Sequence, residues 1–267
     1  MPPVFLMKIV VAIKQVPVRD SPWRIDFSGK WIEEADLSYE INEPDAYALE
    51  AGLQLKEAHG GEVVALCAGP PRVAQTIREA LAKGADRAIH IVEEDPGAPD
   101  PLATARLLAA ALHGEAPDLV LTGLESDDLG YGQTGAILAE LLGLPHATIV
   151  MHVEILDGGI RVKRELEDGW FQHVEMPVPA LLAIQSGFSK LRYATLMGIK
   201  KAKTKQVRRV MAADLGVAGP EGAPAASVTI DRLYLPQRTK RAQLFAGTPQ
   251  QAAAQLVEKL RFEARVI

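Results

Sequence analysis

The sequence holds one glycine-rich stretch whose spacing suits a phosphate group. Gly130, Gly132 and Gly135 form a G-x-G-x-x-G pattern, with Gln133 and Thr134 between the last two glycines. Glycines let the backbone approach a phosphate closely, and the first amides of a helix supply oriented donors with partial positive charge. The pattern also fits a flexible loop that leads into a helix. On spacing alone, a phosphate cradle and a plain helix entry both stay open.

The glycine pattern matches neither of two familiar nucleotide motifs. It follows the fourth predicted strand rather than the first, and the loop from Gly123 is longer than the tight turn of a Rossmann fingerprint. No G-x-x-x-x-G-K-[ST] stretch occurs, which excludes a Walker-type NTPase. A phosphate here would be held by backbone amides and the Thr134 hydroxyl.

Three carboxylates precede the glycine pattern. Glu125, Asp127 and Asp128 lie in the same loop, which carries no cation. A carboxylate here can accept hydrogen bonds from ribose hydroxyls, whereas Asp127 and Asp128 together offer the oxygen ligands that Mg²⁺ takes. A solvated acidic loop explains these residues more simply than a metal site, so no metal is expected.

Catalytic groupings are missing from the sequence. The six histidines form no H-x-x-x-H pair, and none combines with Cys67 or with a serine in a G-x-S-x-G stretch. We therefore expect structural or surface histidines and no catalytic residue.

A second group of residues suits a protein partner. The run 200–205 is basic and begins with Lys200 and Lys201, and it follows a loop that contains Tyr193 and Leu196. A solvated face is the ordinary explanation of such a run. The more specific one is a patch that docks an acidic partner around an apolar contact.

Composition limits the surroundings of the protein. The net charge of −5 gives no argument for nucleic acid or for a membrane surface. No apolar run approaches the ~18 residues of a membrane span. A single cysteine, Cys67, excludes an intramolecular disulfide, and the protein is expected in the cytoplasm.

Alternating strands and helices supply the elements that must position these residues. Strands are expected at 8–13, 62–67, 87–92 and 118–122, and helices at 45–58, 73–83, 102–112 and 133–142. Asn42 is expected to cap the first helix. Four strand–helix units in succession require a mainly parallel sheet with helices on both faces, because right-handed crossovers leave few other arrangements. The predicted fold class is a doubly wound α/β fold.

The pattern changes after Pro145. An antiparallel hairpin is expected over 148–155 and 160–166, followed by strands at 170–176 and 180–184. An excursion hairpin is expected earlier in the chain, over 23–27 and 30–32.

We divide the chain into a nucleotide-binding α/β domain (1–205) and a tail (206–267). The tail has a linker at 214–227 and a last helix capped at Thr248. The tail cannot build a core of its own, so it is expected to dock on a partner subunit.

Several stretches, in the same order along the chain, resemble the β subunits of electron-transfer flavoproteins. They are V-A-I-K-Q-V (11–16), A-G-P (68–70), G-A-D-R (84–87), the glycine loop (128–135), V-K-R-E-L-E-D-G (162–169), E-M-P-V-P-A-L-L (175–182), L-R-Y-A-T-L (191–196), I-K-K-A-K (199–203) and P-Q-R-T (236–239). Each piece alone is a weak match, whereas the ordered set is specific.

The resemblance implies a heterodimeric electron carrier rather than an enzyme. In the family, the α subunit holds most of the FAD, and the β subunit buries an AMP with a structural role. Electrons would come from acyl-CoA or other flavin-containing dehydrogenases and pass to a quinone oxidoreductase of the respiratory chain.

The family's site residues can be carried onto matching positions of this sequence. The implied nucleotide contacts are Ala12 and Ala68 at the adenine, Asn42 and Asp45 beside it, and Asp128, Gly130, Gly132, Gln133, Thr134 and Gly135 at the ribose and phosphate. The implied docking loop is 191–201, with Leu196 as its anchor and with Tyr193, Lys200 and Lys201 around it.

Two departures refine this prediction. Family members often have Asn-Pro-aromatic-Asp where this chain has N-E-P-D (42–45), which puts an aromatic contact to the flavin in doubt. Relatives that bifurcate electrons with a second FAD carry a loop closer to T-A-Q-V-G-P than to G-Q-T-G-A (132–136), so the AMP-containing, non-bifurcating kind is expected. The alternatives are a bifurcating subunit and a stand-alone adenine-nucleotide-binding protein of the universal-stress type. A small nucleotide-dependent ligase or hydrolase would need a catalytic cluster that the sequence does not show.

Overall fold

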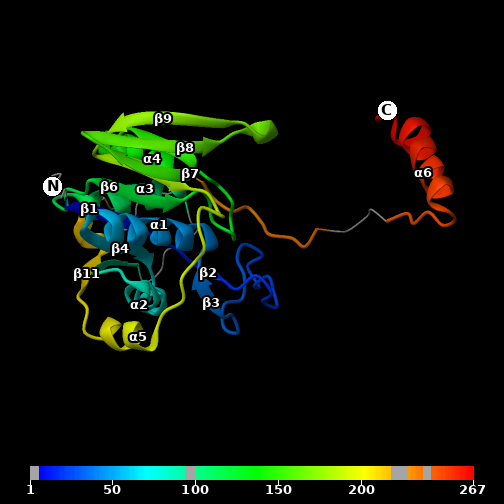
Figure 1. The fold of residues 1–267 in the computed structure, drawn as a ribbon. Coiled ribbons are helices and arrows are strands. Elements are labelled where there is room, and N and C mark those ends of the chain that lie inside the picture. The colour runs from blue at the N-terminus through cyan, green and yellow to red at the C-terminus, as the bar shows by residue number, and fades with distance from the viewer. Residues whose placement is uncertain (1–5, 94–99, 218–227, 237–241) are drawn as a thin grey trace. The chain divides into compact units, whose positions relative to one another are not determined.

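The computed structural model describes residues 6–93, 100–217, 228–236 and 242–267. Its described part contains a nine-stranded sheet in the order β11-β5-β4-β1-β6-β10-β7-β8-β9 (Figure 1). The strands are β1 (Met7–Ala12), β4 (Gly61–Gly69), β5 (Arg87–Val92), β6 (Leu119–Gly123), β7 (His146–Leu156), β8 (Gly159–Glu165), β9 (Phe171–Pro177), β10 (Ala180–Ile184) and β11 (Val207–Met211). A separate two-stranded ribbon pairs β2 (Gln15–Pro17) with β3 (Tyr39–Ile41).

The sheet is parallel along most of its width. Neighbours from β11 to β7 pair in parallel, whereas β7 with β8 and β8 with β9 form the expected antiparallel hairpins. Strand β10 follows β9 in sequence but inserts between β6 and β7. Its five residues are all buried, which explains the uninterrupted apolar run A-L-L-A-I.

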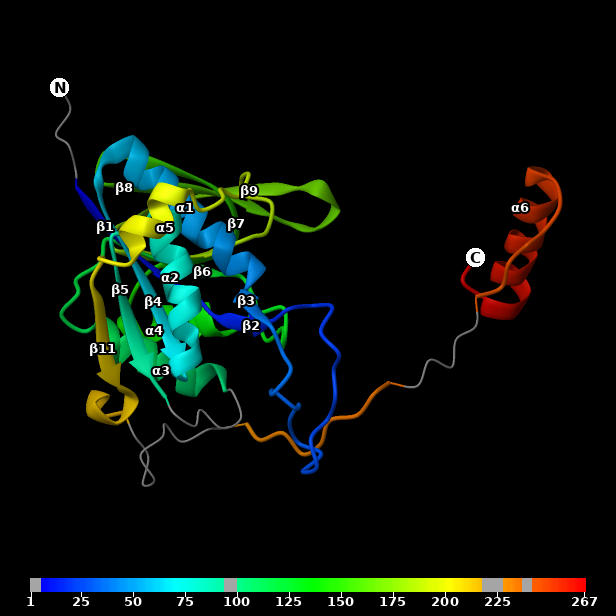
Figure 2. The ribbon, with the colours of Figure 1, turned by 90° about the horizontal axis from the view of Figure 1, so that it is seen from below.

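Helices cover both faces of the parallel region (Figure 2). They are α1 (Glu43–His59), α2 (Ala74–Lys83), α3 (Pro101–Leu112), α4 (Thr134–Leu142) and α5 (Leu196–Ala202). Helices α1 and α2 pack into one hydrophobic cluster with β1 and β4, and α3 and α4 pack into another on the opposite face. The predicted doubly wound α/β fold is confirmed.

The excursion between β2 and β3 is less regular than the predicted hairpin. It contains a single isolated antiparallel bridge between Ile25 and Ile32 rather than two strands. The side chain of Phe27, at its turn, is fully exposed. Without a face packed on the core, so short a pair has little to stabilise it.

Strand β11 lies beyond the boundary expected at residue 205. It pairs with β5 at the edge of the sheet, and the two compact units of the chain divide between Asp231 and Arg232. Its sequence V-R-R-V-M has exposed arginines at its centre, because an edge strand with an uncovered outer side accepts charge. Because of these basic residues, the sequence did not predict this strand.

The second unit, Arg232–Ile267, contains α6 (Pro249–Glu258) and a π-helical turn (Lys259–Ala264). The predicted capping box is confirmed: Thr248 Oγ1 accepts from the Gln251 amide at 3.3 Å, and Gln251 Oε1 accepts from the Thr248 amide at 2.8 Å. Most of the predicted linker, 218–227, lies outside the described residues. Among the helices of the described chain, none is long and apolar enough to cross a bilayer.

Candidate functional site

The order of the strands reverses beside β1. From β1 the chain adds β4 and β5 on one side, and it then places β6 on the other side of β1. In open parallel sheets such a reversal leaves a crevice beyond the carboxyl ends of the strands, where ligands bind. Ala12 ends β1, Ala68 lies next to the end of β4, and the glycine pattern runs from the β6–α4 loop into the first turn of α4. The predicted nucleotide residues therefore share one edge of the sheet.

Asp45, in the first turn of α1, joins the ends of two strands at this edge. Its carboxylate accepts the amide of Lys14, which follows β1, at 2.7 Å and that of Gly123, the last residue of β6, at 2.9 Å. A Cβ on Gly123 would lie 2.4 Å from Asp45 Oδ1, so glycine is needed for α1 to come this close. Burial raises the pKa of Asp45 to about 7, although the two backbone donors oppose that rise.

Asn42 precedes α1 but does not cap it with its side chain. Its Nδ2 donates to the Glu125 carbonyl at 2.9 Å, and its Oδ1 accepts from the Asp127 amide at 2.9 Å. Asn42 therefore occupies the predicted N-cap position, but its side chain binds the β6–α4 loop rather than the first amides of α1. The Asp127 carboxylate accepts instead from the Glu43 amide, at 3.2 Å, in the first turn of the helix. These bonds hold the acidic loop against the start of α1.

Asp128 is paired with a cation that the sequence analysis did not select. Lys14 Nζ lies 2.6 and 2.7 Å from the two carboxylate oxygens of Asp128. The position of Lys14, directly after the first strand, was the available signal. Since Asp127 and Asp128 both have partners, neither needs a metal ion. No group of three or more His, Cys, Asp or Glu within the described ranges could hold one.

The glycine turn has the conformation and the open space that a ligand needs. Gly130 and Gly132 have φ of +61° and +62°, and a Cβ at either position would meet nothing closer than 3.9 Å. The Glu125 carboxylate lies 4.0 Å from both Cβ positions, so Glu125 is the loop carboxylate nearest to this open turn and a candidate acceptor for ribose hydroxyls. Gln133 occupies the N-cap position of α4, and its side chain makes no capping hydrogen bond. The first amides of α4, from Thr134, lack helical acceptors.

A buried hydroxyl lies at the start of the same helix. Thr122, near the end of β6, is 6% exposed, and its Oγ1 has no hydrogen-bond partner among the described residues. A Cβ at Gly135 would lie 2.8 Å from this oxygen. Buried hydroxyls are rarely left unpaired, since doing so costs about 1–3 kcal/mol. Among the described residues, the Thr122 hydroxyl is thus an unpaired polar group beside the amides that begin α4.

The predicted docking residues lie on a separate surface. Tyr193 is 90% exposed and Leu196 is 87% exposed, so Leu196 is not an ordinary core leucine. Leu196 begins α5, which packs against α2, and Lys200 and Lys201 in its last turn are exposed. Exposed apolar side chains therefore lie on the same loop and helix as exposed lysines, and their docking role stays a prediction.

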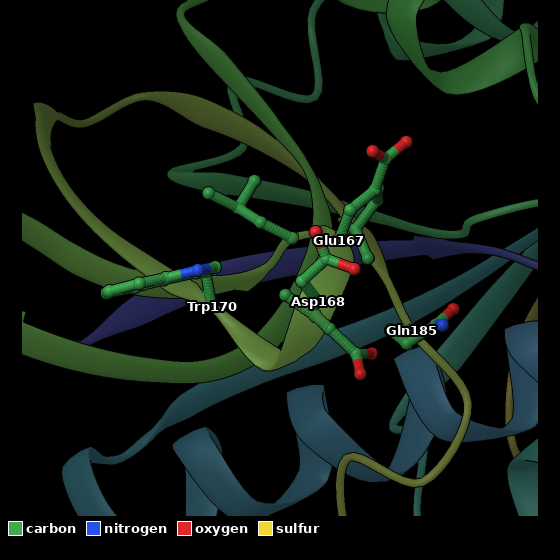
Figure 3. A pocket seen from close by; sticks show the side chains of 7 residues that line it. Glu167, Asp168, Trp170 and Gln185 are labelled. Carbon is green, nitrogen blue, oxygen red and sulfur yellow. The ribbon is translucent and has the colours of Figure 1, made fainter.

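A shallow, open depression of about 710 Å³ lies at the turn of the β8–β9 hairpin, and the sequence analysis did not select it. Figure 3 shows Glu167, Asp168 and Trp170 on the hairpin turn and Gln185 on the segment after β10. Strand β10 is parallel to β6 and ends at Ile184, which pairs with Gly123. Gln185 thus lies at the same carboxyl edge of the sheet as the candidate nucleotide residues, but none of the residues that line the depression is a predicted nucleotide contact.

Comparison with known proteins gives one consistent result. Residues 30–215 match the family model described as "Electron transfer flavoprotein domain". The chain is 37% identical over 257 residues to "Electron transfer flavoprotein subunit beta" of Methylophilus methylotrophus, covering 94% of this chain and 97% of that protein. It is 35% identical to the Bacillus subtilis protein of the same name, with 88% and 91% covered, and 35% identical to the mitochondrial one of Oryza sativa subsp. indica, with 98% and 100% covered.

Proposed function

Because the chain belongs to the electron transfer flavoprotein family, we propose that it is the β subunit of a heterodimeric electron carrier. In this proposal the β subunit buries one AMP as a structural group, and the α subunit binds most of the FAD. Flavin-containing dehydrogenases, of the acyl-CoA type or others, deliver electrons to that FAD, and a quinone oxidoreductase accepts them. The near full-length similarity to β subunits carries the proposal.

The unpaired Thr122 hydroxyl beside the start of α4 is the observation that best supports AMP binding. A phosphate at the N-terminus of α4 accepts hydrogen bonds from the first helix amides and from a hydroxyl, and the helix dipole favours its negative charge. The open turn at Gly130 and Gly132 leaves room for this approach. The ammonium of Lys14 offsets the charge of Asp128, and the Glu43 amide at the start of α1 donates to Asp127, so the repulsion between the acidic loop and the phosphate is reduced.

The remaining parts of AMP also find suitable groups at this edge. Ala12 and Ala68 are small, which leaves space for a flat base over the strand ends. The Glu125 carboxylate, near both glycines, is placed to accept from ribose hydroxyls. AMP carries no redox centre, so its contribution here is to fill and hold the crevice.

The nucleotide content of the purified heterodimer tests this proposal. The chain is co-expressed with its α subunit, the complex is precipitated with acid, and the released nucleotides are quantified by mass spectrometry. We expect one AMP and one FAD per heterodimer. Two FAD and no AMP would establish the bifurcating kind instead, and a stable, flavin-free single chain would favour the stand-alone nucleotide-binding protein.

A pair of substitutions on α4 locates the AMP. In Gly135→Ala the new methyl meets Thr122 Oγ1 at 2.8 Å, so the start of α4 must shift and AMP content should fall well below one per heterodimer. Gly143→Ala, at the other end of α4, is the matched control. Its φ is +65° and its surroundings are open, so it adds backbone strain without touching the crevice. Equal AMP content in both variants would place the nucleotide elsewhere.

A further inference from the structure

The loop that carries Tyr193 and Leu196 is tied to α1 by one arginine. Arg192 Nε donates to Glu50 Oε2 at 2.7 Å, and its Nη2 donates to Glu50 Oε1 at 2.9 Å. Its other contacts reach Glu57, at 2.6 Å from Nη1 and 3.0 Å from Nη2. One guanidinium therefore bridges two carboxylates that lie two turns apart on the same helix.

The receiving face of α1 is built for this contact. Glu50, Gln54 and Glu57 follow at i, i+4 and i+7, so they lie on one side of the helix. The Glu50 side chain is only 5% exposed, and Gln54 Nε2 also donates to it, at 2.8 Å. Gln54 reaches back to Ser189 Oγ in the same loop at 3.2 Å. Two residues of the loop, three positions apart, thus contact one helix face.

The other end of the docking segment is fixed on α2. Thr195 Oγ1 accepts from the Gly198 amide at 3.0 Å and so caps α5. Arg78 of α2 donates to the Ala202 carbonyl, the last residue of α5, at 2.6 Å. Between this contact and the Arg192 contact, the exposed Tyr193 and Leu196 occupy a short stretch that is held at both ends.

We infer that Arg192 is a positioning residue that holds Tyr193 and Leu196 in the arrangement in which they meet the partner. The inference rests on the proposed docking of dehydrogenases. A loop fixed in its bound conformation loses less conformational entropy when it binds, so it binds more tightly without making a new contact. Arg192 suits this task because its planar fork makes two parallel hydrogen bonds to one buried carboxylate, which a lysine does not.

A plain surface ion pair is the competing explanation of these contacts. Exposed ion pairs contribute about 0–1 kcal/mol to stability, so on this explanation the removal of Arg192 leaves partner binding unchanged. Arg161 offers a matched control of that kind. It contacts Glu175 at 2.6 Å and Glu154 at 3.1 Å on the β7–β9 strands, and these side chains are more exposed than Arg192 and Glu50.

The test uses the holo heterodimer as electron acceptor for an acyl-CoA dehydrogenase that is reduced by its acyl-CoA. The KM for the heterodimer and kcat are measured for the unchanged chain, Arg192→Met, Leu196→Ala and the double variant. We expect Leu196→Ala to raise KM by roughly 25-fold or more, as for the loss of a pocket-filling anchor. Arg192→Met should raise KM about tenfold, with kcat unchanged. Arg161→Met should change neither.

The double variant separates positioning from an independent contact. If Arg192 acts by presenting Leu196, then Arg192→Met adds little once Leu196 is alanine, and the two effects on KM are far from multiplicative. Fully multiplicative effects would make Arg192 an independent partner contact and overturn the inference. Arg192→Lys should restore KM only in small part, because it cannot make the two parallel bonds.

A general loss of fold is excluded with a compensated variant. Arg192→Met leaves Glu50 buried without its cation, which destabilises the chain, and Glu50→Leu in the same chain removes that buried charge. We expect Arg192→Met/Glu50→Leu to recover the melting temperature, to keep one AMP per heterodimer and still to show the raised KM. A normal KM in this stable variant would overturn the inference. If Leu196→Ala itself leaves KM unchanged, the docking role fails, whereas normal KM in the Arg192 variants alone refutes only the positioning role.

Discussion

At the scale of single residues, Asp45 connects the fold to the candidate site. Its carboxylate accepts hydrogen bonds from the amide of Lys14, which follows β1, and from the amide of Gly123, which ends β6. These two bonds set how closely α1 approaches the crevice. Its partners are backbone groups, and burial raises its pKa to about 7 against their effect. Lys14, whose amide binds Asp45, also carries the ammonium that pairs with Asp128. The geometry of the β6–α4 loop therefore depends on a carboxyl group whose pKa burial raises to about 7.

The pKa of Asp45 gives the first prediction. An aspartate carboxyl in the unfolded chain has a pKa of roughly 3.9. Between about pH 4 and pH 7, the folded chain therefore binds more protons at Asp45 than the unfolded chain does. The stability from this group is therefore present below about pH 4 and is lost as the pH rises to about 7. Urea unfolding gives the free energy of unfolding of the unchanged chain and of Asp45→Asn. The amount by which the unchanged chain exceeds Asp45→Asn should be larger near pH 5 than near pH 8. A constant difference across this range would contradict the raised pKa.

At the scale of elements, the sequence predicted what periodicity controls and missed what tertiary contacts decide. The central strands and the helices on both faces follow from their apolar runs, and their bounds are off by one or two residues. Strand β11 was missed because charge at a sheet edge resembles a loop. The side-chain partners of Asn42 and Lys14 were not foreseen, because they lie 83 and 114 residues away along the chain. Spacing along the chain cannot show such contacts.

The contact between α5 and α2 gives a prediction about an element. A Cβ at Gly198 would lie 2.2 Å from the carbonyl oxygen of Ala82, so α5 needs glycine at this point to rest on α2. Gly198→Ala should lift α5 and lower the free energy of unfolding by about 1–3 kcal/mol, the usual cost of overpacking. Urea unfolding measures this, and hydrogen exchange should show weaker protection over residues 196–202. Met197→Ala, at an exposed position of the same helix, is the control and should resemble the unchanged chain.

At the scale of the whole molecule, the two units differ in how they are stabilised. The unit Met1–Asp231 contains both hydrophobic clusters of the described chain. The unit Arg232–Ile267 has no buried residue in α6 or in the turn that follows, and Leu256, Val257 and Phe262 are exposed. A helix with an apolar stripe and no core of its own needs a covering surface. We propose that the α subunit supplies it.

Removal of the second unit tests this proposal. A chain that ends at Asp231 keeps both hydrophobic clusters, so its melting temperature in isolation should stay close to that of the full chain. Its affinity for the α subunit should fall strongly, because each 100 Å² of apolar surface left uncovered forfeits about 2.5 kcal/mol of the transfer free energy. Isothermal titration calorimetry of the α subunit with each chain measures this loss of affinity.

Substitutions on α6 test the same surface without changing chain length. In the full chain, Leu256→Asp with Val257→Asp should weaken binding to the α subunit, whereas Gln250→Asp near the start of the helix should have little effect. Unchanged affinity of the truncated chain would show that the α subunit is held by the α/β unit alone.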